Sequence, residues 1–219
     1  MEQKKVSIAV DGPSGAGKST IAKMAAKRLG IDYIDTGAMY RAVAYKILRE
    51  HISLEDQDAL LDMLSRTDVD LSGADVILDG EGIADRIRTP EVTAMASACS
   101  ALPAVREKLV SLQRAMAQKK SVIMDGRDIG TNVLKDADKK FFLTASVDER
   151  AKRRFKEFQE KGRSVSFEQV RADMIERDHN DSTRALNPLS KAEDAVEIDS
   201  TCMSIDEVVN AILEQIASE

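Results

Sequence analysis

The sequence predicts an α/β fold in which a parallel sheet is flanked by helices. Three observations support this prediction. Short apolar runs that suit buried strands alternate with helical patterns, giving five strand–helix pairs. A glycine-rich segment at residues 12–19 joins the first of these strands to the first helix. Between Val69 and Arg88 the pattern changes to short alternating runs separated by glycines, which predicts a small antiparallel β insert.

The first third of the chain shows the alternation most clearly. Residues 6–10 form an apolar run that predicts a buried strand, and the helical pattern of residues 18–29 ends at Gly30, a residue typical of the position after a helix. A second strand is expected at residues 31–34 and a second helix at residues 36–49. These elements make two consecutive strand–helix pairs.

The middle of the chain contains the insert. Ser53 and Asp56 are expected to open a short helix that ends at Leu64. The insert is expected to contain three strands, at Val69–Leu71, Val76–Leu78 and Ile83–Ile87. Turns are expected between them at Ser72-Gly73 and Gly80/Gly82. Two further helices follow, and Pro103 separates them.

The last part of the chain returns to strands and helices in alternation. Strands are expected at residues 121–124, 139–143 and 196–198. Ser146 with Glu149 is expected to form a capping box for a basic helix, Ser166 with Gln169 to cap the next helix, and Ser204/Glu207 to cap the last one. The helix that Ser166 opens is expected to run to about Asn180.

Composition and charge exclude several classes of function. With 219 residues, the chain fits a single domain with an insert, and 32 basic against 38 acidic residues leave a net charge of −6. That balance and the eight Phe and Tyr residues disfavour a nucleic-acid surface. Two cysteines and two histidines form no zinc-ligand pattern, and no apolar stretch is long enough for a signal peptide core or a membrane span. We expect a cytoplasmic monomer.

The strongest motif is the glycine-rich segment, which matches G-x-x-x-x-G-K-[ST] from Gly12 to Ser19. Glycines let backbone N–H groups turn toward phosphate oxygens, and the start of the following helix adds partial positive charge. Lys18 is the expected cation for the β- and γ-phosphates, and the hydroxyl of Ser19 is an expected ligand of Mg²⁺. The alternative is a glycine-rich turn that binds nothing.

A second acidic site is expected where the strand at residues 121–124 ends. Asp125 follows Val122-Ile123-Met124, the position at which phosphate-loop proteins hold a carboxylate that organises the metal, either directly or through water. The alternative is an acid that caps the next turn.

Arginines gather near element ends and on helix faces. Arg177, Asp181 and Arg184 have a spacing that places them on one face of a helix, and Arg150, Arg153 and Arg154 crowd another. Forked guanidinium groups suit the transfer of a phosphoryl group to an acceptor that is itself a phosphate, because two polyanions must meet. The alternative is a solvated face with ion pairs inside the helix.

Five motifs in order make the chain resemble the bacterial-type cytidylate kinases. They are Gly12–Thr20, Asp35-Thr-Gly-Ala-Met-Tyr-Arg41, Ile87-Arg-Thr89, Asp125-Gly-Arg-Asp-Ile-Gly-Thr131 and Glu176-Arg-Asp178. The resemblance implies a P-loop NTPase-type fold and transfer of the γ-phosphoryl group of ATP to CMP or dCMP, with Mg²⁺. It also implies a single domain over residues 1–219, with a nucleoside-monophosphate-binding insert at 66–100 and a lid at 148–166.

The same resemblance implies roles for individual residues. The catalytic residues would be Lys18, Asp125, Arg127 and Arg184. The ATP-binding residues would be Gly12, Pro13, Ser14, Gly15, Ala16, Gly17, Lys18, Ser19, Thr20, Arg150, Arg153 and Arg154, and the metal ligands Ser19 and Asp125. Cytosine would be recognised by Ser97, Arg106 and Asp128. The sugar and nearby phosphate would be bound by Thr36, Arg177 and Asp181, and the acceptor phosphate by Arg41, Arg127 and Arg184.

Two other functions remain open at this point. One is a P-loop kinase for another small metabolite, such as shikimate or a different nucleoside monophosphate. The other is a nucleotide-dependent switch or motor with no acceptor. The chain has no N-K-x-D motif for guanine and no net basic surface, which disfavours the second class.

Overall fold

The computed structural model describes residues 5–72 and 75–218, and it confirms the predicted α/β class. One sheet contains, in spatial order, β2 (Asp32–Asp35), β6 (Val122–Gly126), β1 (Ser7–Asp11), β7 (Lys139–Thr144) and β8 (Val196–Asp199). Strand β1 pairs in parallel with β6 and with β7, and β7 pairs in parallel with β8. The strand that leads into the glycine-rich loop is therefore central in the sheet.

The chain divides into two compact units. The first contains the residues up to Tyr33 and from Lys120 onward, and the second contains Ile34–Lys119. The second unit is longer than the insert expected at residues 66–100. The division into one domain with that insert and a lid at 148–166 stays a prediction.

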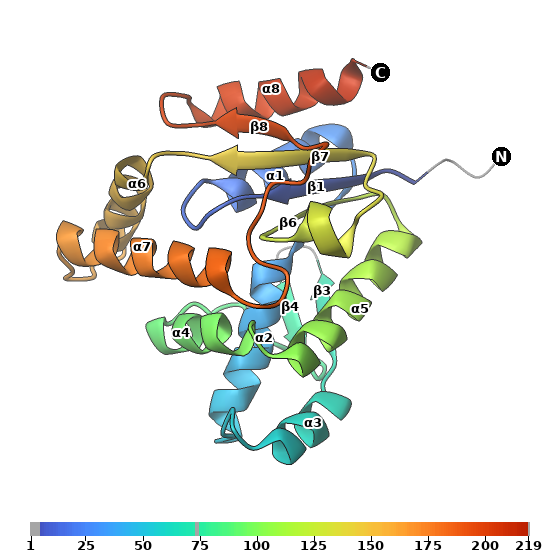
Figure 1. Ribbon diagram of the computed structural model, residues 1–219, viewed down its shortest axis with the longest axis vertical. Helices are drawn as coiled ribbons and strands as arrows, with labels where there is room; N and C mark the ends of the chain where they lie inside the picture. Colours follow the sequence, from blue (N-terminus) through green and yellow to red (C-terminus); the bar gives the residue numbers. More distant parts are fainter. Residues whose placement is uncertain (1–4, 73–74, 219) are drawn as a thin grey trace. The chain divides into compact units, whose positions relative to one another are not determined.

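The core of the first unit lies between the sheet and two helices, α1 (Lys18–Leu29) and α8 (Ile205–Ala217). Helix α1 buries Ile21, Ala22 and Ala25, a spacing that forms one apolar face. Strand β7 leads into α6 (Val147–Glu160), which lies beside α7 (Phe167–Thr183) (Figure 1). A short π-helical turn, Ile129–Val133, follows β6.

The described residues of the second unit form four helices and a small antiparallel sheet. The helices are α2 (Thr36–Arg49), α3 (Gln57–Ser65), α4 (Pro90–Cys99) and α5 (Pro103–Lys119). The sheet, in the order β3-β4-β5, contains β3 (Val69–Ser72), β4 (Asp75–Leu78) and β5 (Glu81–Gly82). The antiparallel insert and the break before Pro103 are confirmed.

The third strand expected in the insert is wrong. Only Glu81 and Gly82 form β5, and the segment from Ile83 to Ile87 is a turn in which Arg86 N donates to Ile83 O at 2.9 Å. Both isoleucines are buried, and their spacing of four residues reflects this turn rather than a strand. Gly80 lies in the β4–β5 turn as expected, whereas Gly82 lies in the strand, and Gly73 falls outside the described residues.

Helix boundaries differ from the sequence prediction at two places. Helix α3 is capped by Asp56, whose carboxylate accepts from Ala59 N at 3.0 Å, while Ser53 lies in the preceding turn. Helix α7 continues beyond Asn180 to Thr183. The serine caps of α6, α7 and α8 are confirmed, and α8 has the complete capping box.

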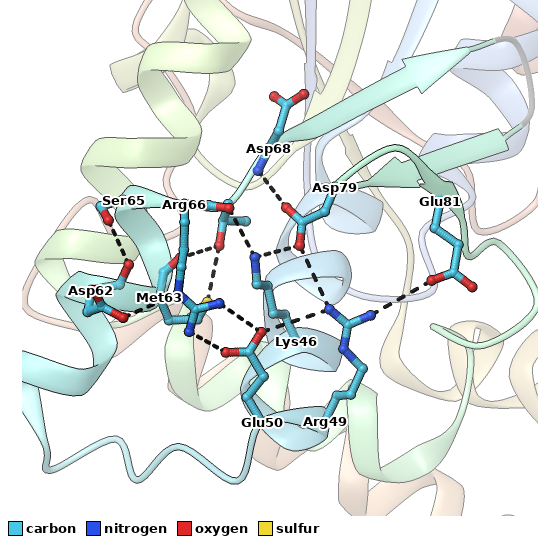
Figure 2. A network of polar contacts seen from close by, with 11 residues as sticks. Lys46, Arg49, Glu50, Asp62, Met63, Ser65, Arg66, Asp68, Asp79 and Glu81 are labelled. Carbon is cyan, nitrogen blue, oxygen red and sulfur yellow. Dashed lines mark hydrogen bonds and ion pairs between the residues drawn. The ribbon is translucent and has the colours of Figure 1, made fainter.

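A buried ion pair joins α2 to the small sheet. The ammonium of Lys46, a residue that is 1% exposed, donates to Asp79 Oδ2 and, at 3.2 Å, to the carbonyl oxygen of Arg66 (Figure 2). Asp79 also accepts from Asp68 N at 2.9 Å. Burial raises the pKa of Asp79, but the bonds from Lys46 and Asp68 outweigh it, so the pKa is lowered. Glu50 holds Arg66 beside this pair.

No helix within the described part of the chain has the length and apolar character that crossing a membrane requires.

Candidate functional site

The glycine-rich loop connects β1 to α1 in a backbone conformation that needs glycine. A Cβ at Gly12 would lie 1.9 Å from the carbonyl oxygen of Leu143, and Gly17 caps α1 with a φ of 90°. Gly17 has no side chain with which to cap the first turn of α1, and the N-terminus of a helix is where backbone N–H groups can bind an anion. This confirms the local structure predicted for the motif.

Lys18 lies at the start of α1 and is almost fully buried. Its ammonium donates to the carbonyl oxygen of Pro13 at 2.7 Å, across the loop. Burial and the nearby charge of Arg127 lower the pKa of Lys18 well below its usual value. Ala16 is also buried, whereas Ser19 and Thr20 are exposed on the first turn of the helix. The cation of Lys18 is therefore buried, whereas Ser19, which carries the hydroxyl, is exposed.

The two expected metal ligands are brought together. Ser19 Oγ donates to Asp125 Oδ2 at 2.8 Å, and Asp125 is 5% exposed at the end of β6. The other carboxylate oxygen, Oδ1, accepts from the hydroxyl of Tyr33 at 2.8 Å. Sequence reasoning missed Tyr33. The signal was available only in the sheet order, because β2 is the neighbour of β6.

A second strand-end carboxylate was also missed. Asp11, at the end of β1, accepts from Ile129 N at 2.8 Å and from Gly130 N at 2.7 Å. Burial raises the pKa of Asp11 to about 6 in spite of these two bonds. A Cβ at Gly130 would lie 3.1 Å from Cδ of Lys140, so the turn after β6 is held closely against β1 and β7.

The turn after β6 carries two predicted acceptor residues, one paired with α7 and the other with the C-cap residue of α7. Arg127 Nε donates to Asp181 Oδ2 at 2.7 Å, and Arg184 Nη2 donates to Asp128 Oδ1 at 2.9 Å. Burial raises the pKa of Asp181, but the positive charges of Arg127, Arg177 and Arg184 outweigh this effect, so the pKa lies below its usual value. Five residues predicted to bind the acceptor are thus brought together in the first unit.

The three arginines of α6 have different surroundings. Arg150 is 4% exposed and donates to main-chain oxygens at Ser14 and Ala145. Arg153 donates to Glu149 and to Ser200, and Arg154 donates to Glu157 and lies over the ring of Phe158. Contact of these arginines with the phosphates of ATP stays a prediction.

The remaining predicted residues belong to the second unit. Thr36 begins α2 and is buried, and Asp35 caps this helix by accepting from Ala38 N at 2.8 Å. A Cβ at Gly37 would lie 3.5 Å from Arg41 Nη1, which places the guanidinium of Arg41 over the first turn.

The last two predicted residues lie on consecutive helices. Ser97, half-buried on α4, and Arg106, buried on α5, both bond to Ser100: Ser97 O accepts from its hydroxyl at 2.8 Å, and Arg106 Nη1 donates to its carbonyl oxygen at 3.3 Å. Arg106 also lies 6.0 Å from the ring centroid of Tyr40. The roles that the resemblance implies for Thr36, Arg41, Ser97 and Arg106 stay predictions.

The chain is similar to known proteins along almost its entire length. The family model described as cytidylate kinase matches residues 8–218. A cytidylate kinase of Caldicellulosiruptor bescii is 51% identical over 215 residues, covering 96% of this chain and 95% of the relative. One of Desulforamulus reducens is 54% identical over 209 residues, covering 94% of each chain.

Solved structures are similar in fold at low sequence identity. An uncharacterised protein from Eubacterium ventriosum has a TM-score of 0.54 at 17% identity, covering 99% of this chain and 100% of its own. A shikimate kinase from Acinetobacter baumannii in complex with shikimate has a TM-score of 0.50 at 16% identity, covering 98% of this chain and 94% of its own. At these identities the likeness shows the fold alone.

Proposed function

The chain belongs to the cytidylate kinase family, and from this membership we propose that it transfers the γ-phosphoryl group of ATP to CMP or dCMP. The products are ADP and CDP or dCDP. The observation that carries the proposal is the family match over residues 8–218, which includes the glycine-rich loop, Asp125 and the arginine face of α7.

The donor triphosphate is proposed to bind in the loop from Gly12 to Thr20. Its N–H groups and the start of α1 receive the phosphate oxygens, and Lys18 exchanges the carbonyl of Pro13 for the β- and γ-phosphates. The depressed pKa of Lys18 then rises, because the phosphates supply the negative charge that the buried ammonium lacks. A buried ammonium without a negative partner is costly in free energy, and the phosphates provide that partner.

Ser19 and Asp125 are the groups proposed to hold Mg²⁺. Their oxygens lie 2.8 Å apart at the end of β6, and oxygen ligands are those that Mg²⁺ prefers. Among the described residues there is no cluster of three or more acidic, Cys or His side chains that could hold a metal, which fits an ion that completes its coordination with water and nucleotide phosphates. Bound there, Mg²⁺ would neutralise charge on the transferring phosphoryl group.

Nine residues are proposed to bind the acceptor nucleotide. Arg41, Arg127 and Arg184 would bind its phosphate, and Thr36, Arg177 and Asp181 its sugar and nearby phosphate. Ser97, Arg106 and Asp128 would recognise cytosine, because a carboxylate accepts from its exocyclic amine and the donors satisfy its carbonyl and ring nitrogen.

The proposed reaction needs no general base from the protein. The attacking oxygen of the acceptor phosphate is already anionic, so alignment and positive charge lower the barrier. Arg177, Arg184 and Lys18 supply that positive charge, and a planar guanidinium group can donate to two phosphate oxygens at once. Neither His51 nor His179 has a chemical role in this scheme.

An acceptor panel tests the proposal against the alternatives. ADP release is measured with ATP and Mg²⁺ in the presence of CMP, dCMP, UMP, AMP, GMP or shikimate, and also without any acceptor. We expect release to depend on CMP or dCMP. Shikimate-dependent release would favour another P-loop kinase, and release indifferent to every acceptor would favour a switch or motor.

The protein is also proposed to be a monomer in the cytoplasm. Sedimentation of the same preparation tests the monomer.

A further inference from the structure

The main chain of Ser14 is bonded on both sides by side chains from α6 and α7. Arg150 Nη1 donates to the carbonyl oxygen of Ser14 at 2.8 Å, and Asp178 Oδ1 accepts from Ser14 N at 3.3 Å. Ser14 lies in the glycine-rich loop, and Figure 1 shows that loop on the side of the sheet where α6 and α7 lie. One peptide segment of the donor loop is therefore fixed by two helices from the far end of the chain.

The two side chains also bind each other. Arg150 Nη1 and Asp178 Oδ2 are 2.6 Å apart, and the side chains are 4% and 20% exposed. Arg150 Nε donates to the carbonyl oxygen of Ala145 at 2.9 Å, which ties the same guanidinium to the end of β7. A planar guanidinium with bonds to three partners has one orientation, so the pair is rigid.

Packing beside the pair supports the same connection. A Cβ at Gly15 would lie 2.9 Å from Cε of Met174 and 3.3 Å from Cβ of Arg150, so the loop touches both helices at the next residue. Helix α7 also carries Arg177 and Asp181, and Arg184 is its C-cap residue; all three are assigned to the acceptor. The donor loop and the acceptor-binding face are thus fastened to each other through Asp178.

We propose that Arg150 and Asp178 are positioning residues, an ion pair that orders the donor loop through the main chain of Ser14 without touching the nucleotide. This inference rests on the proposed kinase function, because it assigns the loop to ATP. It replaces the role that the sequence resemblance implied for Arg150, direct contact with the phosphates. A loop that is ordered before binding loses less conformational entropy when ATP arrives.

The two roles predict opposite effects of removing the charge of Asp178. If Arg150 were a phosphate ligand held by Asp178, the substitution Asp178→Asn would release the arginine and remove a negative charge near the triphosphate, and ATP would bind more tightly. If the pair orders the loop, the same substitution loosens the Ser14 peptide, and ATP binds more weakly. Asparagine keeps the size of the side chain, so folding is disturbed little.

The experiment is calorimetric titration of the whole protein with ATP and Mg²⁺, and separately with CMP, well below the melting temperature of each variant. We expect Asp178→Asn to weaken ATP binding roughly 5- to 10-fold, as the loss of one or two hydrogen bonds implies, and to change CMP binding less than 2-fold. The control is Asp173→Asn, which removes an exposed charge from the same helix, where Asp173 accepts from Gln169. It should leave both affinities within 2-fold.

Arg150→Lys and Arg150→Met separate the roles a second time. If Arg150 bound the phosphates, Arg150→Lys would keep much of its effect on ATP binding. If its guanidinium acts by bonding to both Ser14 and Asp178, that effect is lost in both variants. Unchanged or tighter ATP binding in Asp178→Asn, equal weakening of ATP and CMP, or rescue by lysine would each overturn the proposal. Because ATP binding is read directly, failure of wild-type protein to phosphorylate CMP would count against the proposed function and not against the pair.

Discussion

The hydroxyl of Tyr33 lies 2.8 Å from Oδ1 of Asp125 and fixes the carboxylate whose other oxygen accepts from Ser19. Asp125 is therefore oriented from both sides. Partners that orient a metal ligand in this way affect metal affinity although they do not touch the metal.

Tyr33→Phe removes this bond with little change in shape. We expect the Mg²⁺ concentration for half-maximal phosphoryl transfer to rise roughly 10-fold, because Asp125 loses its fixed orientation. Titration of activity with Mg²⁺ at saturating ATP and CMP measures it. Tyr45→Phe, a hydroxyl deletion in the second unit, is the matched control. An identical Mg²⁺ dependence in Tyr33→Phe would show that the bond from Tyr33 is not needed to orient Asp125.

Lys18 and Asp128 should affect activity in different ways. Lys18→Ala removes the cation of the donor loop, and turnover should fall on the order of 10²–10³-fold with every acceptor. Asp128→Ala should mainly reduce the preference for CMP over UMP, because the exocyclic amine of cytosine loses its acceptor. The ratio of kcat/KM for CMP and UMP measures the second effect. A ratio that stays constant would remove Asp128 from base recognition.

Asp11 should make stability fall as the pH rises from about 4 to 7. Its pKa in the folded protein is about 6, above its ordinary value of 3.8, so the folded state binds the proton more tightly than the unfolded state. The stabilisation from protonated Asp11 is complete below about pH 4 and is lost as the pH passes 6. Relative to Asp11→Asn, the wild type should lose about 2 kcal/mol of unfolding free energy between pH 4.5 and 7.5. Urea unfolding at several pH values measures this difference, and parallel pH curves for the two proteins would contradict it.

The Lys46–Asp79 pair should stabilise the second unit only as a pair. Lys46→Met leaves the Asp79 carboxylate without its buried partner, and we expect a loss of about 2–3 kcal/mol, moderated because the Asp79 side chain is 30% exposed. Adding Asp79→Asn should recover part of this loss, because the carboxylate charge that lost its partner is then gone. A double-mutant cycle in urea gives the coupling, and additive effects would show that the two groups act independently.

Gly12 should tolerate no side chain, in contrast to Gly30. Gly12→Ala brings a Cβ against the carbonyl oxygen of Leu143, so we expect a loss of about 3 kcal/mol or more and weaker ATP binding. Gly30 also has a positive φ, but nothing lies within 4 Å of its Cβ position, and Gly30→Ala should cost only about 1 kcal/mol. Thermal unfolding of both variants measures the contrast. Similar losses would show that backbone conformation alone sets the effect.

The sequence was sufficient for features that depend on local chemistry. The helix at residues 18–29 and the helix at 36–49 have the predicted bounds, because Gly30 and Asp35 provide strong end signals. The helix bounds need no knowledge of which strands are neighbours. Ser19 and Asp125 were each expected near the metal from their motifs, and their contact also depends on β6 lying beside β1.

Features that depend on the neighbour in space were missed. The role of Tyr33 requires β2 beside β6, and the role of Asp11 requires the turn after β6 to lie at the end of β1. The supposed strand at Ile83–Ile87 failed because two buried isoleucines in a turn imitate an apolar strand. Burial of Arg150 was equally hidden, since an arginine on a charged helix is usually exposed.

The pairing of Arg127 with Asp181 and of Arg184 with Asp128 has a consequence for how an acidic protein accepts a polyanion. These arginines already have counter-anions of their own, supplied by the same unit of the chain. In the proposed reaction the acceptor phosphate would replace these carboxylates as partner of the arginines, while the displaced carboxylates stay on the protein as negative charge that the new contacts must outweigh. The specificity of the exchange depends on geometry at contact distance, where bulk salt has little influence.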